Sequence, residues 1–146
     1  MSFRFSLGSV LRFRESMEQR EYLELEKLYR ETATLEEGLR QTVHLISAAT
    51  VNRERRLMEG LQAADLISAC EYERSLQMQC EVLRSRLRQA KMNWQKQLDV
   101  YQTARRKRET LEKLRSSHLD AYNREQAKRE QSTLDDLFLS RRQPHK

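Results

Sequence analysis

The sequence predicts an all-α fold, and more specifically a long two-helix antiparallel coiled-coil hairpin. Turn-forming residues are scarce, because the 146 residues include only three Gly and one Pro, and globular domains ordinarily use many more. Charged residues make up 34% of the chain, and its frequent residues, Glu, Arg, Lys, Gln, Leu and Ala, have the lowest free-energy cost in a helix. Apolar residues also recur at alternating spacings of three and four along two long stretches, which is the pattern of a coiled-coil seam.

The first nine residues have the alternation of an extended segment. Phe3, Phe5 and Leu7 alternate with polar residues, which is a period of two. Ser9 is a suitable N-cap, because its hydroxyl can accept a hydrogen bond from an unpaired backbone N–H of the first helical turn. The first helix is therefore predicted over residues 10–59.

A first seam of apolar and small residues begins after Tyr22 and supports this helix. Its members are Leu25, Leu28, Thr32, Leu35, Leu39, Thr42, Ile46 and Ala49. Glu26 and Arg30 are four residues apart and form a favourable pair on its flank. Towards the N-terminus the same spacing continues only by admitting Arg14 and Glu18, so the seam is less well specified there.

The seam loses its register before Gly60. The next expected positions fall on Arg53 and Arg56. Gly costs about 1 kcal/mol relative to Ala inside a helix but nothing as a C-terminal cap, so the first helix is predicted to end here, with a turn at residues 60–65. A turn nearer Ser68 remains open, because the apolar and small residues before it can also continue the first helix.

A second seam runs along the other half of the chain. Its members are Leu76, Cys80, Leu83, Leu87, Ala90, Trp94, Gln97, Tyr101, Ala104, Arg108, Leu111 and, more loosely, Leu114, His118 and Tyr122. We expect a second helix over residues 66–138, followed by a disordered basic tail at 139–146. Consecutive helices joined by a short connection usually lie antiparallel, and arms of about 50 to 70 residues would be roughly 75 to 105 Å long. No linker divides residues 1–146, so a single domain is predicted.

The residues offer little for catalysis or cofactor binding, and we expect no enzyme, cofactor or metal. His44, His118 and His145 are scattered without the spacing of metal ligands, and two paired helices provide little concavity for an active site. Cys70 and Cys80 form no metal or disulfide pattern and are predicted to be reduced cytosolic thiols. No apolar run approaches the roughly 20 residues that span a bilayer, and no cleavable signal is expected.

Positive charge is concentrated in the second half of the chain. Residues 1–60 carry ten basic and ten acidic side chains, whereas residues 61–146 carry 18 and 12 and so the whole net charge of +6. Such a surface favours an acidic partner, and binding of nucleic acid without sequence preference is one alternative. Because Trp94, Tyr101 and Tyr122 fall on the seam, they are better explained by packing than by base stacking, and no nucleic-acid partner is expected.

Three blocks of the sequence resemble the flagellar export protein FliJ family. The first, FRFSLGSVLRFRE at residues 3–15, has that family's opening of alternating Phe and Arg followed by Val-Leu. The second block, residues 60–87, is similar to the middle segment of that family. In that segment a Gly is followed by an apolar residue, small residues, an aromatic residue and a Leu four positions after the aromatic. The third, residues 105–142, is similar to its closing Leu-Glu-x-Leu-Arg and Leu-Asp-Asp pattern. Together the blocks cover nearly the whole chain.

The resemblance implies a non-enzymatic, stalk-like component of the flagellar type III export apparatus. Its expected partners are the hexameric export ATPase and its regulator, the membrane export gate protein and export chaperones. It also implies a cytoplasmic protein, peripherally associated with the cell membrane at the flagellar base and needed for flagellum assembly and motility. We expect a monomer. The alternatives are an injectisome stalk protein, a generic cytosolic coiled-coil tether and a basic helical hairpin that binds nucleic acid.

Two sets of residues are expected to make the contacts. Those expected at the termini, suited to an apolar and acidic ATPase-ring lumen, are Phe3, Arg4, Phe5, Arg12, Leu137 and Phe138. The other interpretation is that the phenylalanines only staple the helix ends together. By resemblance, those expected beside the turn for the export gate are Leu45, Ala49, Tyr72 and Leu76. Leu45 and Ala49 depart from the family's more aromatic or polar choices, and Leu76 is also a member of the seam.

Overall fold

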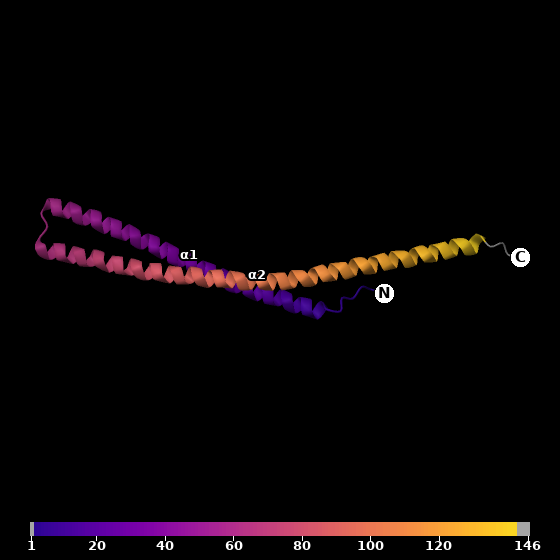
Figure 1. Cartoon of the computed structure of the whole chain (residues 1–146). Coiled ribbons are helices and arrows are strands. Elements are labelled where there is room, and N and C mark those ends of the chain that lie inside the picture. Colours follow the sequence, from indigo (N-terminus) through magenta and orange to yellow (C-terminus); the bar gives the residue numbers. More distant parts are fainter. Residues whose placement is uncertain (1, 143–146) are drawn as a thin grey trace. The chain divides into compact units, whose positions relative to one another are not determined.

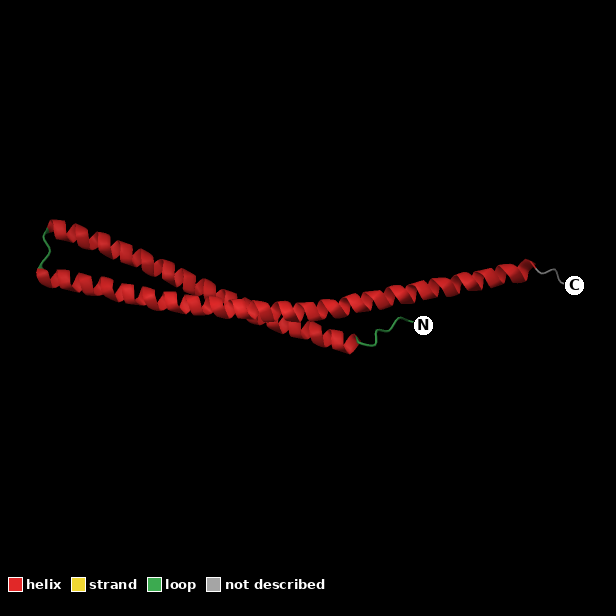
Figure 2. Cartoon of the chain, viewed as in Figure 1, coloured by secondary structure: helices red, strands yellow, loops and turns green. Residues whose placement is uncertain are grey.

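The computed structural model describes residues 2–142, and almost all of them are helical (Figures 1 and 2). Helix α1 spans Gly8–Glu59 and helix α2 spans Ala63–Arg142. No strand occurs within the described residues. The predicted all-α class with two long helices in a hairpin is therefore confirmed.

Contacts within the chain define two compact units through which both helices pass. Unit 1 comprises Met1–Arg20 with Gln102–Lys146, and unit 2 comprises Glu21–Tyr101. Neither a linker nor a change of composition marks this division in the sequence. The two units are described separately below.

Unit 2 is an antiparallel hairpin of α1 and α2. Three polar contacts between the helices show the direction: Glu21 with Gln97, Glu36 with Lys91, and Arg53 with Glu73. Positions in α1 rise as those in α2 fall, which is the signature of antiparallel pairing. The connection at residues 60–62 reverses the chain (Figure 2).

The core of unit 2 is a thin line of side chains between the two helices. Its most buried members are Thr42, Leu76, Cys80, Leu87 and Ala90, all of which occupy predicted seam positions. Within the described residues no large side chain is fully buried. Because the seam is narrow, each of its side chains contributes a large fraction of the apolar contact between the two helices.

Gly60 ends α1 because its backbone turns into the left-handed region. Its φ is 93°, a conformation in which a side chain beyond hydrogen is strained. Helix α2 begins three residues before the predicted start at residue 66, since the N–H of Leu66 donates to the carbonyl of Gln62 at 3.0 Å. Asp65 lies in this first turn, where a carboxylate interacts favourably with the unpaired N–H groups. The turn occupies residues 60–62 rather than the predicted 60–65.

Two glycine substitutions should shift stability in opposite directions. Gly60→Ala is expected to destabilise the hairpin by about 1 to 2 kcal/mol, because a Cβ is strained at this φ although no atom lies near it. Gly38→Ala, inside α1, should stabilise it by about 0.5 to 1 kcal/mol, because its Cβ would meet only Leu83 Cδ2 at an ordinary 4.0 Å. Thermal unfolding followed by circular dichroism measures both, and a melting temperature raised by Gly60→Ala would contradict the assignment of the cap.

In unit 1, α1 begins two residues before its predicted start at residue 10. The N–H of Leu11 donates to the carbonyl of Leu7 at 2.9 Å, and the N–H of Gly8 donates to that of Phe5 at 3.1 Å. Helical hydrogen bonding is therefore established before Ser9, which lies inside the helix and is not its N-cap. Residues 2–7 precede the helix without regular structure (Figure 2).

Helix α2 continues beyond its predicted end at residue 138. Residues 139–142, predicted to belong to a disordered tail, are helical, and 143–146 lie outside the described residues. The Ser140 hydroxyl donates to the carbonyl of Leu137 at 2.9 Å, and the Arg142 guanidinium lies 5.5 Å from the centre of the Phe138 ring. Basic side chains in a last helical turn also interact favourably with its unpaired carbonyls.

Candidate functional site

A groove of about 280 Å³ lies between α1 and α2 next to the turn of unit 2. This tip groove is lined by Ala49, Asn52, Arg53, Arg56, Asp65, Ser68, Ala69 and Tyr72. Small side chains from both helices leave the space open, while three charged residues and one tyrosine surround it. The tip groove can therefore receive a side chain of a partner and offer it both polar and apolar contacts.

An ion pair braces the two helices beside the tip groove. Arg53 Nε donates to Glu73 Oε1 at 2.9 Å, and both side chains are largely shielded from solvent. The hydrogen bond that Arg53 donates to Glu73, together with the negative charge of Glu73, raises the pKa of Arg53. Arg56 also lines the groove but forms no ion pair with another described residue. Its charge is available to a ligand, whereas that of Arg53 is already neutralised.

The four residues expected to contact the export gate are not brought together. Tyr72 is 53% exposed and lines the tip groove with the half-buried Ala49. Leu45 is exposed but does not line the groove. Leu76 is 4% exposed, so its side chain belongs to the seam and is not available to a partner on the hairpin surface.

The N-terminal residues form a second concave surface in unit 1. This terminal hollow, of about 850 Å³, is lined by Phe3, Arg4, Phe5, Ser6, Gly8, Ser9, Leu11, Arg12, Glu15 and Arg115. The Phe3 ring centre lies 5.6 Å from that of Tyr122, and the Phe5 ring centre lies 5.7 Å from that of His118. Both phenylalanines therefore hold the N-terminal segment against α2, as in the stapling interpretation.

Leu137 and Phe138 are separated from the terminal hollow although all belong to unit 1. They lie at least 15 residues beyond Tyr122, which corresponds to about 22 Å along a helix axis. Both are more than half exposed, as is Leu134 one turn earlier. The residues expected at the ATPase ring thus form two surfaces, one around the N-terminus and one on the last turns of α2.

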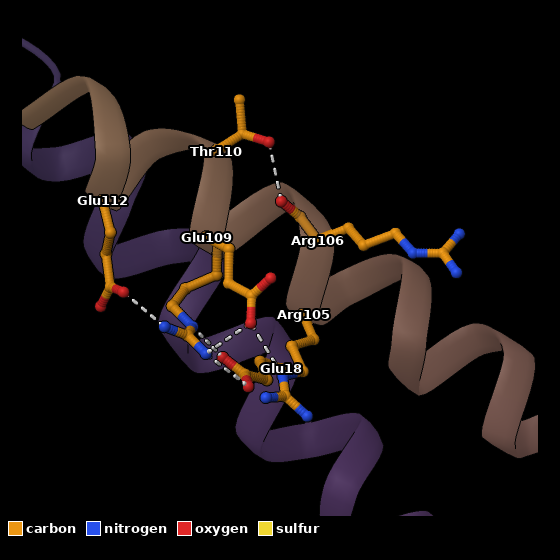
Figure 3. A network of polar contacts seen from close by, with 7 residues as sticks. Glu18, Arg105, Arg106, Glu109, Thr110 and Glu112 are labelled. Carbon is orange, nitrogen blue, oxygen red and sulfur yellow. Dashed lines mark hydrogen bonds and ion pairs between the residues drawn. The ribbon is translucent and has the colours of Figure 1, made fainter.

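A network of ion pairs joins α1 to α2 in unit 1 (Figure 3). Arg108 donates from Nε to Glu18 Oε2 at 2.5 Å and from Nη2 to Glu18 Oε1 at 3.2 Å, and its Nη1 also reaches Glu112. The hydrogen bond that Arg108 donates to Glu18 raises the pKa of Arg108, and the one that it donates to Glu112 adds to this against the opposing effect of desolvation. Because the pKa is raised, the contribution of Arg108 to stability is fully present below the ordinary pKa of arginine, hence at every physiological pH.

The Glu18–Arg108 pair should show a measurable coupling in unit 1. Both side chains are about four-fifths shielded from solvent, so removing Arg108 leaves the charge of Glu18 without its partner. In a double-mutant cycle of Glu18→Gln and Arg108→Gln we expect a coupling free energy of about 1 kcal/mol, measured by urea unfolding. The exposed pair of Arg129 and Glu125 is the matched control and should give a coupling near zero. Equal coupling in the two cycles would contradict a special role for Arg108.

Sequence reasoning missed these ion pairs, although the sequence carried a signal for them. Glu18, Arg53 and Arg108 are charged residues at seam positions, where an apolar residue is the rule. A charge at such a position needs an opposite charge on the facing helix. Which residues face one another depends on the alignment of the two helices, and the spacing within either helix does not define it.

Two of the three aromatic residues on the second seam make ring contacts within the chain. The ring centre of Tyr101 lies 5.9 Å from that of Tyr22 in unit 2, and Tyr122 packs on Phe3 in unit 1. Trp94 is half buried. The ring contacts support the interpretation of Tyr101 and Tyr122 as packing residues.

Two further features are absent from residues 2–142. No helix in that range has a stretch both long and apolar enough to span a bilayer. Nor do these residues place three or more His, Cys, Asp or Glu side chains where they could hold a metal ion.

Comparison with protein-family models matches residues 3–145 to the family described as Flagellar FliJ protein. Comparisons with curated proteins and with solved structures found no match. The family match covers essentially the whole chain, including both helices, the tip groove and the terminal hollow.

Proposed function

Because this chain belongs to the flagellar FliJ protein family, whose members are components of the flagellar export apparatus, we propose that it acts as a stalk-like link between the export ATPase ring and the membrane export gate. In this role it catalyses no reaction itself. It also interacts with the regulator of the ATPase and with export chaperones, and it is required for flagellum assembly and motility. The observation that carries the proposal is the family match over residues 3–145.

The hairpin of unit 2 supports the gate contact. Its two helices are tied together by the seam and, near the tip, by the ion pair of Arg53 and Glu73, so a force applied at the tip is transmitted along both helices. The tip groove offers Tyr72 and Ala49 with the charge of Arg56 beside them. We propose that the gate protein binds here, with the exposed Leu45 as a further contact.

The ATPase contact is proposed for the last turns of α2. Leu137 and Phe138 are exposed there beside basic residues, which suits an apolar and acidic lumen. Phe3 and Phe5 pack against α2 inside unit 1. The exposed Arg4 and Arg12 are therefore the residues of the N-terminal segment that we propose to contact the ATPase. The protein would then lie on the cytoplasmic side of the membrane at the flagellar base, held by its partners.

Deletion of the gene tests the proposal directly. We expect loss of swimming in soft agar and loss of hook and filament subunits from the culture medium, both restored by the wild-type gene on a plasmid. Normal motility and secretion in the deletion strain would refute the proposed function. Genome position provides a second test, since genes for a rotary-type ATPase and flagellar structural proteins are expected nearby.

Substitution of Tyr72 tests the gate contact separately from folding. In the deletion strain complemented with Tyr72→Ala, the swimming halo and the secreted subunits should fall by about tenfold, because an aromatic anchor in a groove often contributes well over 1 kcal/mol to binding. Tyr29→Ala is the matched control, since this tyrosine of α1 is also exposed and lies outside the tip groove. If both variants swim equally well and show the same helical content, Tyr72 is not a contact residue.

A further inference from the structure

An open groove runs along α2 in unit 2 and shares no lining residue with the tip groove or the terminal hollow. It has a volume of about 600 Å³, and its exposed surface is mostly apolar. On one side is the row formed by Arg74, Met78, Val82 and Arg86, with residues four positions apart. On the other side is the neighbouring row of Glu71, Ser75, Gln79 and Leu83. We call this surface the α2 groove.

The spacing of these rows is that of a helix-packing surface. Side chains four residues apart form ridges on a helix, and the groove between two such ridges receives the matching ridge of another helix crossing at about −50°. Ser75 keeps the depression open because its side chain is small. Met78 is 63% exposed and Val82 is 50% exposed, which leaves two apolar side chains in the middle of one ridge without cover from the chain.

Charge selects the kind of helix that fits. Arg74 and Arg86 stand at the two ends of the apolar pair, twelve residues apart and so about 18 Å along the axis. Neither forms an ion pair or a hydrogen bond with another described residue. Glu71 offsets part of the charge at the Arg74 end, so the Arg86 end is the more strongly positive.

We propose that the α2 groove binds an amphipathic helix of a partner protein that carries two aliphatic residues flanked by carboxylates. The partner ridge has the pattern Glu-x3-Leu-x3-Leu-x3-Glu, or its Asp and Ile equivalents. Its aliphatic pair covers Met78 and Val82, and its carboxylates meet the two arginines. This is helix-in-groove recognition, and it adds a third surface to the two contacts of the proposed function without depending on them.

The test uses the full chain and a fluorescein-labelled helical peptide of about 20 residues with this pattern, stapled on its opposite face because short helices are marginal alone. Fluorescence anisotropy should show saturable binding that weakens as salt is raised. Met78→Asp should weaken the binding by about tenfold or more. Met92→Asp is the matched control, since Met92 is 55% exposed on the same helix but does not line the groove, and it should leave the affinity unchanged.

A charge swap tests the direction of the electrostatic contact. The chain with Arg86→Glu should lose affinity for the Glu-flanked peptide and gain affinity for a peptide with Lys at the corresponding end. Absence of saturable binding to the wild-type chain, or equal weakening by Met78→Asp and Met92→Asp, would overturn the proposal. Sedimentation velocity tests whether a second copy of the chain covers the groove instead. If the wild type is a dimer and Met78→Asp dissociates it, the second copy is the occupant, and the proposal of a partner helix is overturned.

Discussion

Replacing Leu76 by Asp should open the hairpin of unit 2. Leu76 is 4% exposed and lies one turn from Cys80, which is 3% exposed. The substitution removes a buried aliphatic side chain and places an uncompensated charge in the seam, and together these should cost about 3 kcal/mol or more. Because a small domain is stable by only about 5 to 15 kcal/mol, the loss is large enough to be seen as local unfolding at moderate temperature.

Thermal unfolding and hydrogen exchange measure this effect. The Leu76→Asp variant should melt at a lower temperature, and the backbone amides on both sides of the tip should exchange faster. The matched control is Met78→Asp, which introduces the same charge two residues away at a position that is 63% exposed. It should leave the melting temperature nearly unchanged. A Leu76→Asp protein as stable as this control would place Leu76 on the surface and return it to the expected gate contacts.

The spacing of apolar residues was sufficient to predict the seam of unit 2. Thr42, Leu76, Cys80, Leu87 and Ala90 all occupy predicted positions and are the most buried residues of the unit. The physical reason is that periods of three and four place residues on one face of a helix, whatever the partner. A pattern of this kind identifies the buried face from either helix alone.

The contacts between helices were less predictable, because they depend on how two faces are aligned. Spacing could not show that Arg108 meets Glu18, or that Tyr72 and Ala49 share a groove with Arg56. It also could not separate the terminal residues into two surfaces. The N-terminal segment lies against α2 near Tyr122, so α2 continues for several turns beyond the point at which its N-terminal partner ends. The extent of α2 past residue 138 was not predicted either, although the Thr133 hydroxyl donates back to the carbonyl of Arg129 at 2.9 Å and is therefore satisfied within the helix.

The last turns of α2 provide the prediction with the largest effect on function. Leu134, Leu137 and Phe138 are exposed at 61%, 54% and 63%, and they lie at positions i, i+3 and i+4, hence on one face. Full burial of such a side chain in a partner contributes about 1.5 to 3 kcal/mol. Replacing all three by Ser should therefore weaken binding to the export ATPase by at least about 100-fold and abolish swimming and subunit secretion in the complemented deletion strain.

Folding should be unaffected by the triple substitution, because none of the three side chains is buried in the chain. The control replaces three apolar residues of α1 that are similarly exposed, Leu23, Val43 and Val51, by Ser. The control protein should bind the purified ATPase and restore swimming like the wild type, and both variants should keep the wild-type circular dichroism spectrum. If the α2 variant binds the ATPase with wild-type affinity, the last turns of the helix do not enter the ring. Arg4 and Arg12 at the terminal hollow would then be the remaining candidates, and Arg12→Glu would show an effect that the α2 variant lacks.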